Sequence, residues 1–391
     1  MNLSRKWLLG AASMIAVVFG LSTAGQATPT HAQLSCDNPP FDVSQISNVW
    51  NLTDFCQFEE GIFGEILSGG VPRDGIPPID APEFESIEVA SEWLQPQSPV
   101  LSVEIEGDAR AYPLAIMTRH EIVNDVFDER PVAVTFCPLC NSGIVFDRVV
   151  DDETLRFGVS GLLRNSDLIM WDDLTQSWWQ QFTGQGIVGE FTGRQLETLP
   201  SVMASFGQFV EQYPDGLVLS RSGRSYGSNP YVNYDSTDNP FLFLGEVDDR
   251  LLATERVLAG MIAGEPTAYP FSVLRGEPVI NDTVGGLDVV ALWQSGKASA
   301  LDAAVIDDGR DVGTAALYER TFDGETLTFS LDEDDNIRDD QTGSIWNVFG
   351  TAVEGELAGG QLRQVLAAPH FWFAWAAFQP ETAIYGIDAA E

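Results

Sequence analysis

The sequence predicts a mainly β protein, or an α+β protein, made of two related β-rich units with about one helix each. Runs such as "PVAVTF" at 131–136 and "GIVFDRVV" at 143–150 are rich in β-branched and aromatic residues. One stretch, "AYPLAIMTRHEIVND" at 111–125, recurs as "AYPFSVLRGEPVIND" at 268–282, and such internal similarity indicates a duplication. Helical patterns are few: "LPSVMASFGQFVEQYP", with a start at Pro200, and "APHFWFAWAAFQP" near the end.

The chain begins with a pattern typical of a secretory signal peptide. Two basic residues precede the apolar run 7–21, and small residues follow it. The run is shorter than the roughly 20 residues that a membrane span needs, so we expect cleavage after Ala32, or after Ala24, rather than an anchor. The sequence therefore predicts a signal peptide at 1–32. The protein should be exported, periplasmic or extracellular, with no stable membrane insertion after cleavage.

Residues 33–97 precede the repeated segments and form a predicted N-terminal covering segment. They contain a stretch rich in proline and glycine at 69–84, which is typical of a loop. Aromatic residues such as Trp50 should pack this segment onto the body of the protein. In an oxidising compartment, we expect a structural disulfide between Cys36 and Cys56.

The rest of the chain divides into a first repeat unit, 98–256, and a degenerate second unit, 257–391. Motifs recur in the same order, because "TQSWWQQFTG" at 175–184 is matched by "TGSIWNVFG" at 342–350. We interpret shared positions as those that both units need to fold, and unshared positions as candidates for function. The shared positions are Tyr112 and Tyr269, Asn124 with Asp125 and Asn281 with Asp282, Ser177 and Ser344, and Trp179 and Trp346.

The charge of the chain excludes some partners. The formal net charge is −38, and residues 1–32 contain two basic residues and no acidic ones, so the rest is more acidic still. Such a surface repels nucleic acid and anionic lipid. The sequence indicates no particular protein partner.

Cys137 and Cys140 stand in "FCPLCNSG" at 136–143, and three interpretations of this pair are open. A structural disulfide that tightens a turn is the usual outcome in an exported protein. A thioredoxin-like redox pair needs a helix after the second cysteine, but a strand-like run follows here. A turn between two strands can also direct both sulfur atoms at one metal ion, which would require further ligands.

His120 is the candidate third ligand, because it precedes the cysteines in the same unit. In the ungapped alignment of the two units, Glu277 lies opposite His120, and Gln294 and Lys297 lie opposite the two cysteines. The histidine and both cysteines are thus absent from the second unit together. Glu121, next to this histidine, could accept a proton in catalysis or could be a solvated carboxylate.

The first unit is longer between its matched strands, within "GVSGLLRNSDLIMW" at 158–171. Its polar residues interrupt an apolar run and could form a loop over the cysteine turn. Trp178 has Ile345 opposite it and could line a pocket. The expected substrate-binding residues are Arg164, Asn165, Ser166, Asp167 and Trp178.

At these motifs the chain resembles the family catalogued as domain of unknown function 3179. The motifs "HEIVND", "VTFCPLCNSGIVFDR" and "TQSWWQQFTG" carry the resemblance, which runs from about residue 100 to the end. It implies an exported protein with a C-P-x-C turn and a preceding His-Glu pair, and it implies no particular reaction. Asn141 stands where we would expect glycine, although asparagine tolerates the same left-handed backbone region.

The expected function is a soft-metal centre of Cys137, Cys140 and His120 that serves for binding copper or zinc or for metal-linked redox chemistry. Thiolates and imidazole suit Cu⁺ and Zn²⁺. The first alternative is a thiol-disulfide oxidoreductase that uses the cysteine pair. The second is a non-catalytic binding or scaffold module with a structural disulfide in the turn.

Overall fold

The computed structural model describes residues 48–387, all within one unit, Ser35–Glu391, and these residues form several small β-sheets with short helices. The prediction of a mainly β fold is confirmed. The predicted signal peptide and Cys36, and with it the expected Cys36–Cys56 disulfide, lie outside the described residues. Within 48–387, no helix is both long and apolar enough to span a bilayer.

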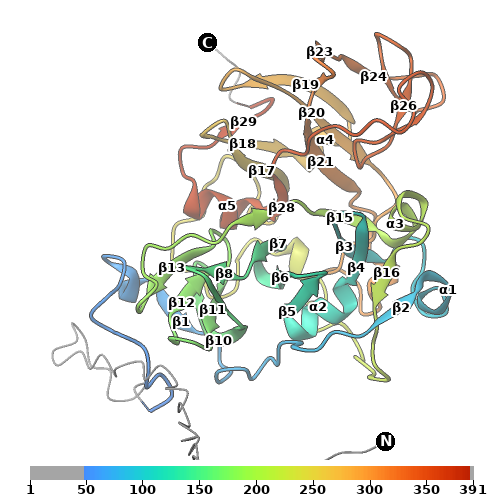
Figure 1. Ribbon diagram of the computed structural model, residues 1–391. Coiled ribbons are helices and arrows are strands. Elements are labelled where there is room, and N and C mark those ends of the chain that lie inside the picture. The colour runs from blue at the N-terminus through green and yellow to red at the C-terminus, as the bar shows by residue number, and fades with distance from the viewer. Residues whose placement is uncertain (1–47, 388–391) are drawn as a thin grey trace, which may run out of the picture. The chain divides into compact units, whose positions relative to one another are not determined.

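Strands between residues 66 and 219 form three sheets (Figure 1). The first sheet has the order β15-β3-β4-β16-β2, the second β14-β7-β6-β5, and the third β1-β10-β11-β12-β13. The strands are β1 Ile66–Ser68, β2 Phe84–Ser86, β3 Pro99–Ile105, β4 Asp108–Pro113, β5 Ile122–Phe127, β6 Arg130–Cys137, β7 Ser142–Asp147, β10 Phe157–Arg164, β11 Asp167–Asp172, β12 Trp178–Gln180, β13 Gln185–Val188, β14 Thr198–Leu199, β15 Val202–Ser205 and β16 Leu217–Leu219, with the small hairpin β8 Val149–Val150 and β9 Glu153–Thr154.

Three further sheets are formed by the segment 256–384. Their orders are β28-β17-β18-β29, β19-β20-β21 and β24-β25-β26-β27. The strands are β17 Arg256–Ile262, β18 Glu265–Pro270, β19 Val279–Val284, β20 Leu287–Gln294, β21 Thr314–Glu319, β24 Phe329–Leu331, β25 Ile337–Asp339, β26 Ile345–Trp346, β27 Ala352–Glu354, β28 Ala368–Phe371 and β29 Ala383–Ile384, with the small hairpin β22 Thr321–Phe322 and β23 Glu325–Thr326.

The helices are short, and each predicted unit has two of them rather than about one. The α-helices are α1 Ile87–Ala90, α2 Leu114–His120, α3 Phe206–Gln212, α4 Phe271–Leu274 and α5 Trp372–Phe378; the 3-10 helices are η1 Ile62–Gly64, η2 Pro138–Cys140, η3 Tyr234–Ser236 and η4 Ile306–Asp308.

The predicted helix start at Pro200 is wrong, because residues 202–205 pair with β3 as strand β15. Helix α3 begins only after Ser205, whose hydroxyl accepts a hydrogen bond from the Gln208 backbone N–H at 3.2 Å. The Gln208 side chain accepts one from the Ser205 backbone N–H at 3.0 Å. This reciprocal capping box fixes the N-terminus of the helix.

The two segments repeat several hydrogen bonds at the positions that the sequence predicts to be shared. The Tyr112 hydroxyl donates to Asp125 Oδ2 at 2.5 Å, and the Tyr269 hydroxyl donates to Asp282 Oδ2 at 2.9 Å. In the first sheet of each segment, one short strand pairs in parallel: β16 with β4, and β29 with β18. These similarities support the predicted duplication, which stays a prediction.

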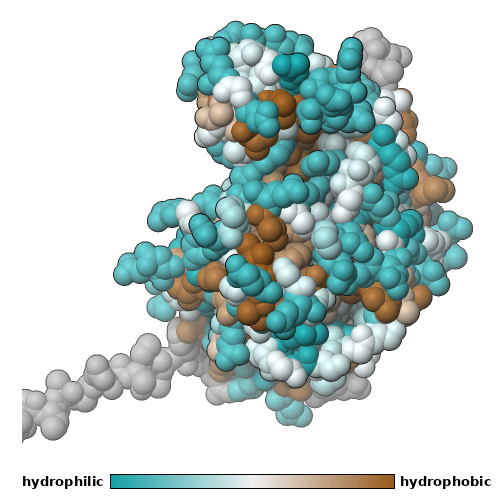
Figure 2. Space-filling model, turned by 90° about the vertical axis from the view of Figure 1, so that its right-hand side faces the viewer, coloured by the Kyte–Doolittle hydropathy of each residue, from teal (hydrophilic) through white to brown (hydrophobic). Residues whose placement is uncertain are grey.

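The main hydrophobic core joins both segments. It includes Phe136 and Phe146 of the β6–β7 hairpin as well as Phe371 and Trp372 near the C-terminal end. Strand β28 lies beside β7 (Figure 1). The face of the molecule in Figure 2 is mostly hydrophilic, with separate hydrophobic patches, as the acidic composition leads one to expect. Cys137 and Cys140 themselves also belong to the main hydrophobic core.

Candidate metal centre

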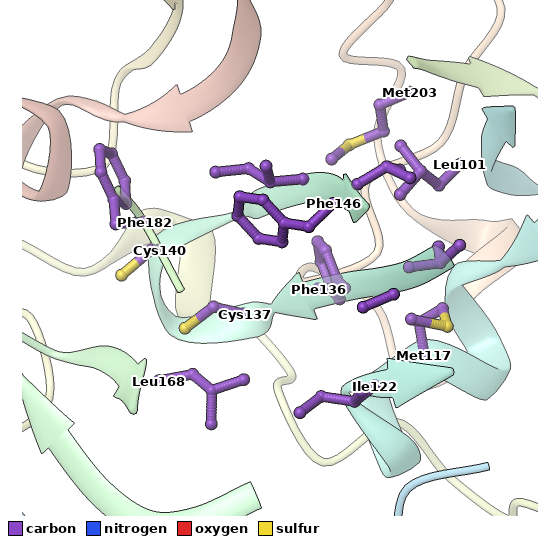
Figure 3. Packing of buried hydrophobic residues seen from close by; sticks show 14 of the residues in the cluster. Leu101, Met117, Ile122, Phe136, Cys137, Cys140, Phe146, Leu168, Phe182 and Met203 are labelled. Carbon is purple, nitrogen blue, oxygen red and sulfur yellow. The ribbon is translucent and has the colours of Figure 1, made fainter. Parts of the chain in front are cut away.

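The β6–β7 hairpin places both cysteines at one tight turn. Cys137 ends β6 and pairs with Ser142 at the start of β7. Pro138 opens a single turn of 3-10 helix, and Asn141 closes it with a left-handed φ of 50°, which asparagine tolerates. Figure 3 shows the two sulfur atoms pointing in the same direction at the end of the hairpin. Both cysteines are free thiols, and both are buried.

Asp167 completes a group of three ligand atoms. It is the first residue of β11, directly after the turn at Asn165 and Ser166, which both have positive φ values. Its carboxylate and the sulfur atoms of Cys137 and Cys140 all lie within 4.8 Å of one another. Within residues 48–387, this is the one group of three or more His, Cys, Asp or Glu side chains close enough to share a metal ion.

Ionisation of the three side chains of the group is unfavourable without a cation. Burial, followed by proximity to Cys137, raises the pKa of the Cys140 thiol well above its usual value, and burial also raises that of Cys137. Burial raises the pKa of Asp167 to about 7, against hydrogen bonds that lower it. No basic side chain is among the groups that shift these three pKa values. A bound cation would stabilise the ionised forms of all three ligands.

Several buried polar atoms around the group have no hydrogen-bond partner in the described part of the chain. Asp167 Oδ2 accepts hydrogen bonds from Gln180 Nε2 at 2.5 Å and from the Phe182 backbone N–H at 2.9 Å, whereas Oδ1 accepts none. Buried polar groups in native structures are usually satisfied, so unpartnered ones indicate a bound ion or water. Near the turn, the other unpartnered atoms are Asn141 Nδ2 and Ser142 Oγ. On β12 and at the residue after it, they are Trp178 Nε1, Gln180 Oε1 and Gln181 Oε1.

His120 is not a member of this group. Its Nδ1 lies 2.6 Å from the Pro77 carbonyl oxygen, and its Nε2 lies 3.4 Å from Arg224 Nη1. The ring also contacts Tyr226 edge-on, with ring centroids 5.6 Å apart. Both ring nitrogens thus contact groups other than the cysteines, and the third member of the group is Asp167 rather than the predicted His120.

Glu121, which follows helix α2, is buried close to the centre. Its backbone has a positive φ of 58°, a conformation that costs a glutamate roughly 1–3 kcal/mol. Burial, followed by the charge of Asp167, raises the pKa of the Glu121 carboxyl group to about 8. Its own charge in turn contributes to the raised pKa of Cys137. It is therefore an acidic neighbour of the centre and not a solvated surface carboxylate.

The remaining predicted substrate-binding residues have structural contacts. Arg164 forms ion pairs with Glu59 and Glu65. Trp178 packs edge-on against Trp50, with ring centroids 5.4 Å apart.

In the turn before β11, Asn165 and Ser166 both have a left-handed backbone conformation. The Ser166 hydroxyl donates a hydrogen bond to the Phe241 carbonyl oxygen. The Ser166 carbonyl oxygen lies 3.7 Å from Cys137 Sγ. Of the predicted residues outside the cysteine pair, the structure places Ser166, Asp167 and Glu121 at the centre.

A cavity of about 580 Å³ adjoins the centre. Its wall includes Leu139, which lies between the two cysteines, and Leu168, which follows Asp167. The segment 230–241 forms another side of it, where the Tyr234 hydroxyl donates a hydrogen bond to the Leu139 carbonyl oxygen at 3.1 Å. None of the predicted site residues lies in this segment. A signal for it is the set of aromatic residues in "NPYVNYDSTDNPFLF" at 229–243, near the end of the first repeat unit.

The comparisons with known proteins agree with the resemblance seen in the sequence. The profile of one family, described as "Protein of unknown function (DUF3179)", matches residues 73–382. No curated protein and no solved structure matches the chain. Because the match covers most of the chain, including the cysteine hairpin, β11 and the segment 230–241, the chain belongs to the DUF3179 family.

Proposed function

We propose that the protein binds a soft or borderline metal ion through Cys137, Cys140 and Asp167. The observation that supports this most is the convergence of two thiols and one carboxylate within 4.8 Å in a buried site. Bond lengths of about 2.0–2.3 Å around a tetrahedral zinc place ligand atoms roughly 3.5–4 Å apart, so only small movements are needed. The unpartnered Oδ1 of Asp167 is available for coordination.

The donor set favours Zn²⁺ over Cu⁺. Zinc accepts sulfur and carboxylate oxygen ligands together, whereas Cu⁺ prefers sulfur ligands. Two cysteines and one aspartate are three protein ligands, and a zinc site with three protein ligands keeps one position for water or substrate. Copper, held by the two thiolates alone, is the second candidate.

The two other interpretations compete for the same residues. A thiol-disulfide oxidoreductase needs an accessible thiolate of low pKa, whereas here burial raises the pKa values of both thiols. A structural disulfide would join the same two sulfur atoms in an oxidising compartment. Both alternatives predict a Cys137–Cys140 disulfide in the purified protein, and the metal proposal predicts two thiolates that hold an ion.

The test is the metal content of untagged protein, measured by elemental mass spectrometry together with the state of the thiols. We expect about one zinc per chain, lost in Cys137→Ser, Cys140→Ser and Asp167→Asn. His120→Gln is the matched control, because it changes a neighbouring buried ligand-type side chain outside the group, and it should keep the metal. A metal-free wild type with a disulfide between the two cysteines would overturn the proposal. So would loss of metal in His120→Gln but not in Asp167→Asn.

A further inference from the structure

The cavity beside the metal centre has mainly apolar walls from three separate parts of the chain. Strands β10 and β11 contribute Val159, Leu163 and Leu168, and the loop after β1 contributes Val71 and Ile76. The segment 230–241 closes another side with Tyr231, Val232, Tyr234 and Phe241. Pockets of about 300–1,000 Å³ with such walls hold small organic molecules, and this cavity has a volume of about 580 Å³.

A bulge in β10 brings the loop after β1 close to the cavity wall. The register of β10 against β11 shifts between Val159 and Leu163. Gly161 lies in this bulge with a φ of 79°, and a Cβ atom there would lie 2.1 Å from the Val71 carbonyl oxygen. Only glycine therefore allows the two walls to approach each other here.

Glu121 is the one carboxylate in the cavity lining. Only burial and the charge of Asp167 shift its pKa, with no hydrogen bond among the causes. No described residue therefore forms a hydrogen bond or ion pair with its carboxyl group. Its oxygen atoms are not among the fully enclosed, unpartnered side-chain atoms of the described residues, and Glu121 lines the cavity. A ligand in the cavity could therefore provide the missing hydrogen-bond partner.

The charges around the cavity restrict the ligand. No lysine, arginine or histidine lines it, so an anionic ligand would have no positively charged partner there. A cationic ligand would bury its charge against apolar walls, which is costly. An uncharged ligand with one hydrogen-bonding group avoids both penalties.

We propose that this cavity binds an uncharged, largely apolar small molecule that directs one hydrogen-bonding group, such as a carbonyl oxygen, at Glu121. The walls supply the affinity through burial of apolar surface, and Glu121 fixes the orientation of the ligand. The ligand lies next to the metal centre, but its binding does not rest on the proposed metal. The site is therefore a second binding function of the same region.

The experiment uses the protein without its signal segment and the neutral dye N-phenyl-1-naphthylamine, whose fluorescence rises in apolar surroundings. We expect saturable binding at one site. Three naphthalene derivatives of matched size then compete: 2-acetylnaphthalene, 2-naphthoate and 2-(aminomethyl)naphthalene. The ketone should compete about tenfold more strongly than either charged compound, which corresponds to about 1.4 kcal/mol. Equal competition by the acid or the amine would overturn the proposed ligand class, and the absence of saturable binding would overturn the site.

Variants locate the binding site. Leu163→Trp and Val232→Trp obstruct the cavity from different walls and should weaken dye binding about tenfold or more. Val353→Trp, at a similarly exposed valine of β27 outside the cavity, should leave it unchanged. Val232 is 42% exposed, so its substitution should fold even where Leu163→Trp does not. Unchanged dye binding in a folded Val232→Trp protein would place the dye elsewhere and contradict the proposal.

Two further measurements separate the role of Glu121 and the role of the metal. Glu121→Leu should remove the preference for the ketone, and Glu121→Gln, which can still donate a hydrogen bond, should keep it. Metal content is measured in the same samples. Asp167→Asn should lose the metal and still bind the dye, so failure of one proposal leaves the other standing. Loss of dye binding in Asp167→Asn would show that the cavity is not an independent site.

Discussion

The two segments of the chain connect an equivalent pair of strands in different ways. In the first segment, Cys137 at the end of β6 pairs with Ser142 at the start of β7, and the tight cysteine turn joins them. In the second segment, Gln294 at the end of β20 pairs with Thr314 at the start of β21. There the connection is the long loop 295–313. The connection between equivalent strands thus carries a candidate metal centre in one segment and is a long loop in the other.

The long loop of the second segment contacts the first segment around the cavity. Asn229 Nδ2 donates hydrogen bonds to the carbonyl oxygens of Ala300 and Ala303, each at 2.9 Å. The Asn233 backbone N–H donates to the Asp302 carbonyl oxygen at 2.7 Å. These bonds hold the segment that closes one side of the cavity. The comparison teaches that the second segment, which has no cysteine pair, supports the site of the first.

The largest expected effect on stability comes from removing the carboxylate of Asp235, which lies in the segment 230–241. Its buried carboxylate forms ion pairs with Arg256 and Arg310, each at 2.8 Å. Asp235→Ala leaves the buried Arg256 without its partner and should lower the free energy of unfolding by about 3–5 kcal/mol, as measured by urea denaturation. Arg310→Ala is the control. Because that side chain is 42% exposed, its loss should cost only about 1 kcal/mol. Equal losses in the two variants would contradict this account.

A smaller effect tests whether a tryptophan–aspartate hydrogen bond that both segments contain stabilises both segments alike. Trp179 Nε1 donates to Asp172 Oδ2 at 2.9 Å, and Trp346 Nε1 donates to Asp339 Oδ2 at 2.9 Å. Trp179→Phe and Trp346→Phe each leave a buried carboxylate oxygen short of one donor, which should cost about 1–3 kcal/mol in the same urea assay.

Metal affinity should distinguish these two tryptophan variants. Trp179 precedes Gln180, whose side chain donates to Asp167, so only Trp179→Phe should weaken metal binding. A titration with zinc and a competing chelator measures this difference. A similar loss of affinity in Trp346→Phe would mean that the two segments are not separated in function as the comparison suggests.

The smallest expected effect concerns Lys297, which lies opposite Cys140 in the aligned units. Its Nζ donates to the Met203 carbonyl oxygen at 2.7 Å. Burial, followed by the charge of Arg256, lowers its pKa to about 7. Above that pKa, the unfolded chain binds a proton that the folded chain lacks, so this group makes stability rise with pH towards its unfolded pKa.

The expected rise is up to about 1.4 kcal/mol per pH unit. Lys297→Met should lack this contribution, and urea denaturation of both proteins at about pH 7 and pH 8 should show a difference of about 1 kcal/mol. Identical pH dependence in the two proteins would show that the lysine stays charged in the fold.

The sequence predicts the strands and turns of this protein better than it predicts which side chains from separate elements lie together. Period-two apolar runs and turn residues indicate the β6–β7 hairpin and its cysteine turn. Asp167 is named by the sequence as a polar residue of an unshared stretch, but its approach to the cysteines depends on how two separate sheets pack. His120 precedes the cysteines in the same unit, yet its ring direction follows from the end of helix α2 and its contact with Pro77. Trp178 likewise packs against Trp50, far away in the sequence.

The hydrogen bonds between Asn229 and the loop 295–313 have a consequence for how the protein can vary. Changes in that loop, far from the cysteines in sequence, would alter one wall of the cavity while leaving Cys137, Cys140 and Asp167 unchanged. The shape of the cavity can therefore diverge among related chains while the three candidate ligands stay the same.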